Sequence, residues 1–242
     1  MHHELQIDHS TENEPLATVP EALAPSVLSE DLALSQLNNR EITADAIEKL
    51  TQNAGLMKSR KVRMALASHP RTPRRIALRV IRELYTFELM QLALLPGTAG
   101  DVRRFADELL LSRLSSITLG ERISLARRSS GRIAGALLLD KETPVWQAAL
   151  ENPRLTESAI VKALQRSTAV PAFVESVSHH MKWSVRPETR VALLRNAHTP
   201  FARAIEFARR IPPAQLRDIL HTSRLPERIK QYLNKHPQKS TL

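Results

Sequence analysis

Apolar residues recur at helical spacing through most of the chain, from Lys61 onward, and Pro, Thr and Asn interrupt them where strands would show alternation or hairpin turns. Two of the interrupted segments each present one apolar side. The first side comprises Ile76, Ala77, Val80, Ile81 and Leu84, and the second comprises Ala159, Ile160, Ala163 and Leu164. This spacing is typical of helices that bury one face. The pattern predicts an all-α chain of short helices.

The interruptions also repeat. VRMALASHPRTP (62–73), VWQAALENPRLT (145–156) and TRVALLRNAHTP (189–200) align without gaps, LRDILHTSRLP (216–226) is a weaker copy, and LARRSSGR (125–132) is a degenerate one. The aligned helix-ending positions are His69, Arg128, Asn152, Asn196 and Thr222. Their separations of 59, 24, 44 and 26 residues are close to multiples of a unit of 22 to 30 residues. Such a period indicates a helical repeat array whose copies have diverged.

Each interruption has the chemistry of a joint between two helices. A residue that precedes proline, such as Asn152 before Pro153, is disfavoured in the α region, so the helix ends there. We expect Asn152–Pro153 to be a structural joint and not a site, because the same feature recurs at equivalent positions. The predicted N-caps of following helices are Ser29, Thr43, Thr72, Thr118 with Glu121, Thr156 and Thr199. Pro73 and Pro200 are expected at the first helical position.

The HPRTP and NPRLT junctions, flanked by ALA-type and Ile/Leu-rich helices, resemble the leucine-rich repeat variant and, more loosely, HEAT-like repeats. The resemblance covers most of residues 62–234 and implies a right-handed α-solenoid. Some members of the variant family carry a Cys-rich cluster-binding segment, but this chain has no Cys, so we expect no cofactor. HEAT-like folds also host DNA glycosylases. Their catalytic Asp and aromatic pair have no match here, so that activity does not carry over.

The polarity of the chain divides it into four parts. Residues 1–25 are acidic and Pro-interrupted and predict a disordered tail, and residues 26–60 predict N-terminal capping helices. Residues 61–236 are predicted to form the repeat array, and residues 237–242 a disordered C-terminus. The N-terminus has no secretory signal pattern, and the run IAGALLL (133–139) is far shorter than the ~20 residues of a membrane helix. A soluble, cytoplasmic protein without membrane contact is expected.

Charge is unevenly placed along the chain. Residues 1–50 hold ten Asp/Glu and two Lys/Arg, a net of −8, whereas residues 51–242 hold 33 Lys/Arg and 15 Asp/Glu, a net of +18. Arg outnumbers Lys, 26 to 9, and Arg binds phosphate and carboxylate groups bidentately. Two interpretations stay open: an Arg-rich solvated surface, or affinity for an anionic partner that the acidic head masks.

Two sets of basic residues are candidates for binding. Arg71, Arg154, His198 and Arg224 each lie two residues after an aligned helix-ending position, so in a regular stack they would form one row along one edge. Arg75, Arg79 and Arg82 lie at helical spacing and would form one stripe. Either set is a solvated face whose Arg stems cover apolar surface, or a basic track for phosphates or an acidic protein segment.

Other polar clusters predict no chemistry. His179–His180 has no third ligand at metal spacing, so no metal site is expected, and LPGTAGDV (95–102) predicts a turn. Trp146 and Trp183 are predicted to lie in the core or between repeats. We therefore predict a non-catalytic scaffold that binds another protein. The alternative is a module that binds nucleic acid, without sequence preference, through an Arg-rich face.

Overall fold

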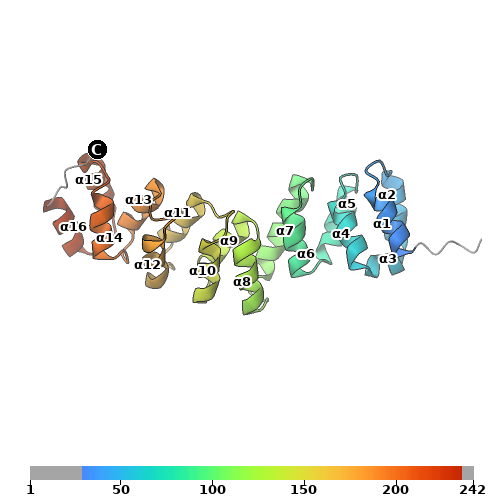
Figure 1. The fold of residues 1–242 in the computed structure, drawn as a ribbon, viewed down its shortest axis with the longest axis horizontal. Coiled ribbons are helices and arrows are strands. Elements are labelled where there is room, and N and C mark those ends of the chain that lie inside the picture. Colours follow the sequence, from blue (N-terminus) through green and yellow to red (C-terminus); the bar gives the residue numbers. More distant parts are fainter. Residues whose placement is uncertain (1–28, 236–242) are drawn as a thin grey trace, which may run out of the picture.

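The computed structural model describes residues 29–235, and all regular structure in that range is helical (Figure 1). The first helices are α1 (Glu30–Asn38), α2 (Ala44–Gln52), α3 (Ala54–Lys58), α4 (Arg60–Ser68), α5 (Arg74–Arg82) and α6 (Thr86–Leu94). They are followed by α7 (Gly100–Arg113), α8 (Leu119–Arg128), α9 (Gly131–Leu137), α10 (Thr143–Leu150) and α11 (Glu157–Gln165). The last are α12 (Pro171–His179), α13 (Pro187–Arg195), α14 (Phe201–Ala208), α15 (Pro213–His221) and α16 (Glu227–Lys235). The all-α prediction is confirmed for the described range, and the predicted tails at 1–25 and 237–242 lie outside it.

The helices are packed in tandem into two rows. Helices α4, α6, α8, α10 and α12 contact one another in turn, and α5, α7, α9, α11, α13 and α15 do the same. Arg203 Nε of α14 donates to Ser178 O of α12 (2.7 Å), and α14 packs on α16, so both continue the first row. Figure 1 shows the result as an elongated stack from α1 to α16. This tandem packing is compatible with a helical repeat.

Two sides of the stack follow from this alternation. From α4 to α16, the even-numbered helices end where the odd-numbered helices begin, and we call that side the first edge. The odd-numbered helices end where the even-numbered ones begin, on the second edge. Each edge is therefore a series of joints between successive helices.

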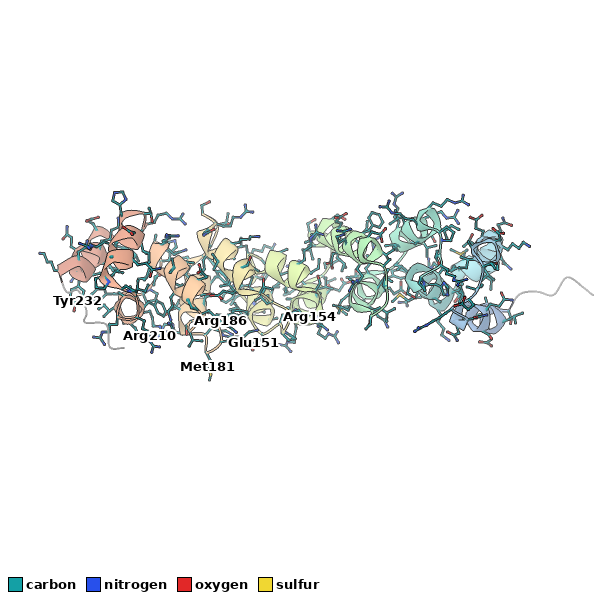
Figure 2. All side chains as sticks on the ribbon, turned by 90° about the horizontal axis from the view of Figure 1, so that it is seen from above. Glu151, Arg154, Met181, Arg186, Arg210 and Tyr232 are labelled. Carbon is teal, nitrogen blue, oxygen red and sulfur yellow. The ribbon has the colours of Figure 1, made fainter. Side chains whose placement is uncertain are left out.

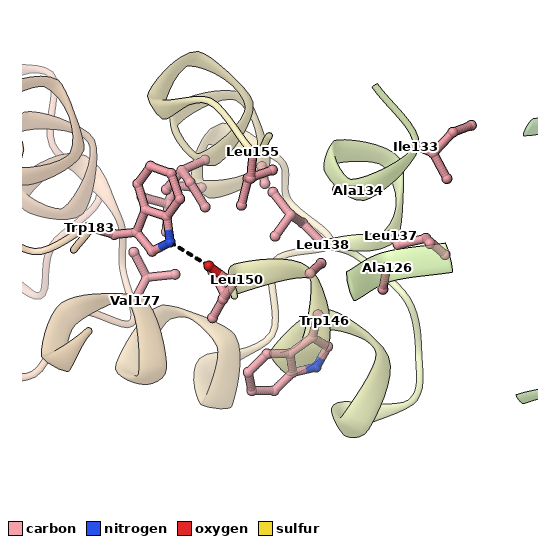
Figure 3. Close-up of a cluster of buried hydrophobic side chains, with 14 of the residues drawn as sticks. Ala126, Ile133, Ala134, Leu137, Leu138, Trp146, Leu150, Leu155, Val177 and Trp183 are labelled. Carbon is pink, nitrogen blue, oxygen red and sulfur yellow. Dashed lines mark hydrogen bonds between the residues drawn. The ribbon is translucent and has the colours of Figure 1, made fainter. Parts of the chain in front are cut away.

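The buried apolar side chains form two clusters. One runs from Ala33 to Leu66 within α1–α4, and the other runs continuously from Ala67 to Leu233. The predicted apolar side of the first segment is buried from Ile76 to Leu84. Figure 3 shows Trp146 and Trp183 inside the larger cluster, each 1% exposed, so their predicted place in the core is confirmed. No helix in residues 29–235 is long and apolar enough to cross a membrane.

Four of the predicted helix starts have the predicted chemistry. The side chains of Ser29, Thr43 and Thr156 accept the N–H three residues on, at 3.2, 3.3 and 3.3 Å. Thr118 accepts the Glu121 N–H at 3.3 Å, while Glu121 Oε2 accepts the Thr118 N–H at 2.9 Å. That reciprocal pair is a capping box. The backbone N–H and the hydroxyl of Thr118 both donate to the Glu121 carboxylate, which lowers the pKa of Glu121.

The predicted caps Thr72 and Thr199 are wrong. The N-cap positions of α5 and α14 are Pro73 and Pro200 themselves, with extended ψ of 132° and 141°, so neither proline occupies the first helical position. Thr199 lies one residue further out, and its hydroxyl donates to Leu193 O (2.6 Å) at the end of α13. Thr199 therefore hydrogen-bonds the joint to the end of α13, the helix that precedes it.

Candidate binding surface

The joint at Asn152 is built around one buried amide. Asn152 is 0% exposed, and its Nδ2 donates to Ala126 O (2.8 Å) and Ser129 O (3.2 Å) at the end of α8. Its Oδ1 accepts the Arg154 N–H (2.8 Å) two residues on. One side chain thus closes its own turn and satisfies carbonyls that the preceding even-numbered helix leaves free. The break is a structural joint, as predicted.

The same turn chemistry recurs along the stack. The side chains of His69, His180, Asn196 and Ser223 accept the N–H two residues on, at 3.2, 3.2, 2.9 and 3.0 Å. The sequence alignment is therefore one residue out in the copy at 216–226, because Ser223, not Thr222, is the equivalent of Asn196. The sequence alignment also misses the joint at His180. There the indole N–H of Trp183 donates to Leu150 O at the end of α10 (3.0 Å; Figure 3).

The joints make two separate ladders of hydrogen bonds. On the first edge, Arg154 Nη1 also donates to Arg128 O (3.3 Å), which joins the α10–α11 joint to the end of α8. On the second edge, Asn196 Nδ2 donates to Leu164 O (2.7 Å), and Ser223 Oγ donates to Leu194 O (2.6 Å). Each ladder links helices of one row. Joints with the same sequence signature therefore occur on both edges.

The division of these joints between two edges changes the predicted row of basic residues. Arg71 and Arg154 lie at first-edge joints, whereas His198 and Arg224 lie at second-edge joints, so the structure does not bring the four together. Arg224 Nη2 instead donates to Gln165 O (3.2 Å) at the end of α11. All four side chains are exposed.

Acidic residues of α2 and its preceding loop pair with part of the predicted basic set. Arg71 pairs with Glu41, and Arg75 pairs with Glu48. Of the α5 stripe, Arg79 lines a shallow pocket beside Glu48, while Arg82 stacks on Phe105 with the guanidinium carbon 5.8 Å from the ring centre. The three stripe residues are exposed. The acidic N-terminal helices thus neutralise the beginning of the basic surface and not its later part.

A different row of arginines occupies the first edge. The joints α8–α9, α10–α11, α12–α13 and α14–α15 carry, in order, Arg128, Arg154, Arg186 and Arg210. Figure 2 shows Arg154, Arg186 and Arg210 along the same side of the stack. Sequence reasoning missed this row because it aligned joints of both edges. Counting every second joint would have found it.

Exposed apolar side chains interrupt the arginine row. In the α12–α13 joint, Met181 is 91% exposed and Val185 55% exposed, and each is followed directly by a cation, Lys182 and Arg186. Met181 projects outward between Arg154 and Arg210 in Figure 2. Neither side chain is required by the core, because Trp183 of the same loop supplies the buried anchor.

The C-terminal part of the first edge has an excess of positive charge. Burial lowers the pKa of the Arg190 guanidinium, and the nearby charge of Arg210 lowers it further, as does Arg203, while Glu206 opposes them. Arg203 is itself paired with Glu206. Repulsion among these cations means that an added anion would be stabilised here.

A groove lies between α9 and α11, next to Arg154. It has a volume of about 700 Å³. Its cations are Arg132, Arg154, Lys162 and Arg166. Small and apolar residues also line it, namely Gly131, Gly135, Ala136, Leu139, Ala159 and Ala163, together with the hydroxyls of Thr156, Ser158 and Thr168. No carboxylate is among the residues that line it.

Metal-ligating side chains do not gather in residues 29–235, where no group of three or more His, Asp or Glu could hold an ion. Of the pair His179–His180, the ring Nε2 of His180 lies 3.1 Å from Glu151 Oε1.

Comparison with known proteins finds no relative: no family model, curated protein or solved structure matches the chain.

Proposed function

We propose that the chain is a non-catalytic helical scaffold that binds another protein along its first edge. The observation that supports this most is the exposed pair Met181 and Val185 set among Arg154, Arg186 and Arg210. Met and Arg are enriched in protein interfaces, and an apolar centre with a charged rim is their usual anatomy. A purely solvated basic face would not need the apolar centre.

Affinity capture from an extract of the cells that make the protein tests this, with nuclease present. We expect the wild-type chain to retain a defined protein partner and the variant Arg154→Glu/Arg186→Glu/Arg210→Glu to lose it. The matched control Lys141→Glu/Arg195→Glu/Arg228→Glu changes the same charge at exposed second-edge positions and should retain it. Equal loss in both variants, or no partner that survives nuclease, contradicts the proposal.

Binding of nucleic acid is the second candidate, and the four arginines at successive first-edge joints favour it. Arginine–phosphate contacts release counterions, so four contacts to duplex DNA predict a slope of about −3 to −4 in log K against log salt. The triple first-edge variant should flatten that slope. Absence of binding to any DNA or RNA at low salt excludes this candidate.

We also propose that the stack is a right-handed α-solenoid of the HEAT-like or leucine-rich repeat variant type. The alternation of two helix rows and the recurring Asn or His joints support this assignment. An experimental structure in which successive helix pairs turn to the left would contradict it.

A further inference from the structure

We propose that the groove between α9 and α11 binds an extended acidic peptide segment of the partner. This inference rests on the proposed function, and it names the ligand chemistry and the place where the scaffold recognises it. The cations, the floor and the lining residues each restrict the ligand in a different way.

Small residues form the floor of the groove, where α9 packs closely against α11 and the joint before it. Gly131 lies so near Arg154 O that a Cβ would overlap it, and a Cβ on Gly135 would lie 3.1 Å from that of Ala159. The two helices therefore meet at their small residues, and Ala136 and Ala163 extend this surface. The groove volume of about 700 Å³ lies within the range of roughly 300–1,000 Å³ for specific pockets.

The cations around that floor are available to a ligand. Lys162 of α11 and Arg166, directly after α11, are exposed, and neither belongs to an ion pair within residues 29–235. Arg132 is 3.5 Å from Glu108, with both side chains about half exposed, so water or a ligand carboxylate replaces that contact at little cost. Arg and Lys bind carboxylates through charge-assisted hydrogen bonds. A ligand with several carboxylates is complementary in charge to these cations.

The remaining lining favours a peptide over a nucleic acid strand. Single-stranded nucleic acids bind through aromatic side chains on which the bases stack, and the groove is lined by none. Its hydroxyls, from Thr156, Ser158 and Thr168, suit the carbonyl groups of a peptide backbone. A duplex would contact the row of arginines on the edge and leave the groove unfilled.

Fluorescence anisotropy with a labelled decapeptide of alternating Glu and Ala tests the inference on the full chain. We expect saturable binding that weakens with salt, and at least a tenfold loss of affinity in Lys162→Glu/Arg166→Glu, because charge-assisted contacts are lost. The control Arg103→Glu/Arg104→Glu, at exposed positions of α7, should stay within about twofold of wild type. Ala136→Phe fills the groove without changing charge and should also weaken binding, with circular dichroism confirming the fold of each variant.

Three outcomes overturn the inference. The groove and control variants could lose affinity equally, which would mean that net charge alone attracts the peptide. A ten-nucleotide DNA could bind more tightly than the peptide and depend on the groove residues. Replacing Glu4, Asp8, Glu12 and Glu14 with Gln or Asn could raise peptide affinity tenfold, which would make the chain's own acidic segment the occupant.

Failure of this inference is distinguishable from failure of the proposed function. If the peptide does not bind but the partner is still captured through Arg154, Arg186 and Arg210, only the groove assignment is wrong. If the peptide binds through Lys162 and Arg166 but no protein partner is retained, the first-edge function is wrong.

Discussion

Asn152 shows how one residue determines a joint. Its amide carries a donor and an acceptor, so it bonds both the preceding even-numbered helix and its own turn. Asn196 does the same on the second edge, whereas the joint at His180 divides the task between the His ring and the Trp183 indole. The Asn joints were predictable because Asn before a turn has known chemistry. The divided joint was not, because its donor comes from a residue three positions later.

Replacing Asn152 with Ala should destabilise the fold by about 2–3 kcal/mol, since two carbonyls of the α8 end and the Arg154 N–H lose their partner in a buried site. Urea denaturation measures this. The control is Asn39→Ala, because Asn39 makes the same turn bond to the Glu41 N–H (3.0 Å) at an exposed position. Its cost should be below about 1 kcal/mol, and equal costs would mean that burial of the joint is unimportant.

Asp107 makes stability depend on pH. Burial raises its pKa above the ordinary 3.8, although Ser130 Oγ donates to its two oxygens at 2.8 and 3.0 Å. The folded state therefore binds the proton more tightly than the unfolded state, and stability falls as pH rises from the ordinary value through the raised one. Asp107→Asn keeps an acceptor for Ser130 without the buried charge. Its melting temperature should exceed wild type at pH 7, and a difference that does not shrink toward pH 3.5 would contradict this explanation.

At the scale of elements, α9 packs closely against α11 and the joint before it, because its contact residues Gly131 and Gly135 have no side chain. Gly131→Ala should cost about 1–3 kcal/mol, because the new methyl group overlaps Arg154 O and the backbone must shift. Gly120→Ala in α8 has open space around it and should stabilise by about 0.5–1 kcal/mol. Thermal denaturation of both variants compares them directly, and a neutral Gly131→Ala would mean that α9 and the α10–α11 joint are not in close contact.

Helix periodicity and turn chemistry predicted most elements, but they did not predict which edge a joint occupies. Every helix ends with carbonyl groups that have no partner within the helix, whether the helix is even-numbered or odd-numbered. Joints on both edges therefore use Asn, His or Ser. Arg71 and Arg224 thus looked equivalent in sequence and lie on opposite edges. Only the packing of helices two apart separates them.

Across the whole molecule, charge is arranged along the stack. Glu41 and Glu48 of the acidic N-terminal part pair with Arg71 and Arg75, while the later first-edge joints keep Arg154, Arg186 and Arg210 exposed beside Met181. Masking of the basic surface by the acidic head was one of two interpretations that the uneven charge left open. Among residues 29–235, the ion pairs from Glu41 and Glu48 reach the α4–α5 joint and the start of α5.

The most direct test of binding along the first edge is site-specific photocrosslinking in an extract treated with nuclease. Met181→p-benzoylphenylalanine places the probe between the exposed arginines, and Thr222→p-benzoylphenylalanine places it at an exposed second-edge position. We predict a discrete protein adduct from position 181 that is absent from position 222 and from the triple first-edge charge variant. Adducts of equal yield from both positions, or none from position 181, would contradict the proposed function.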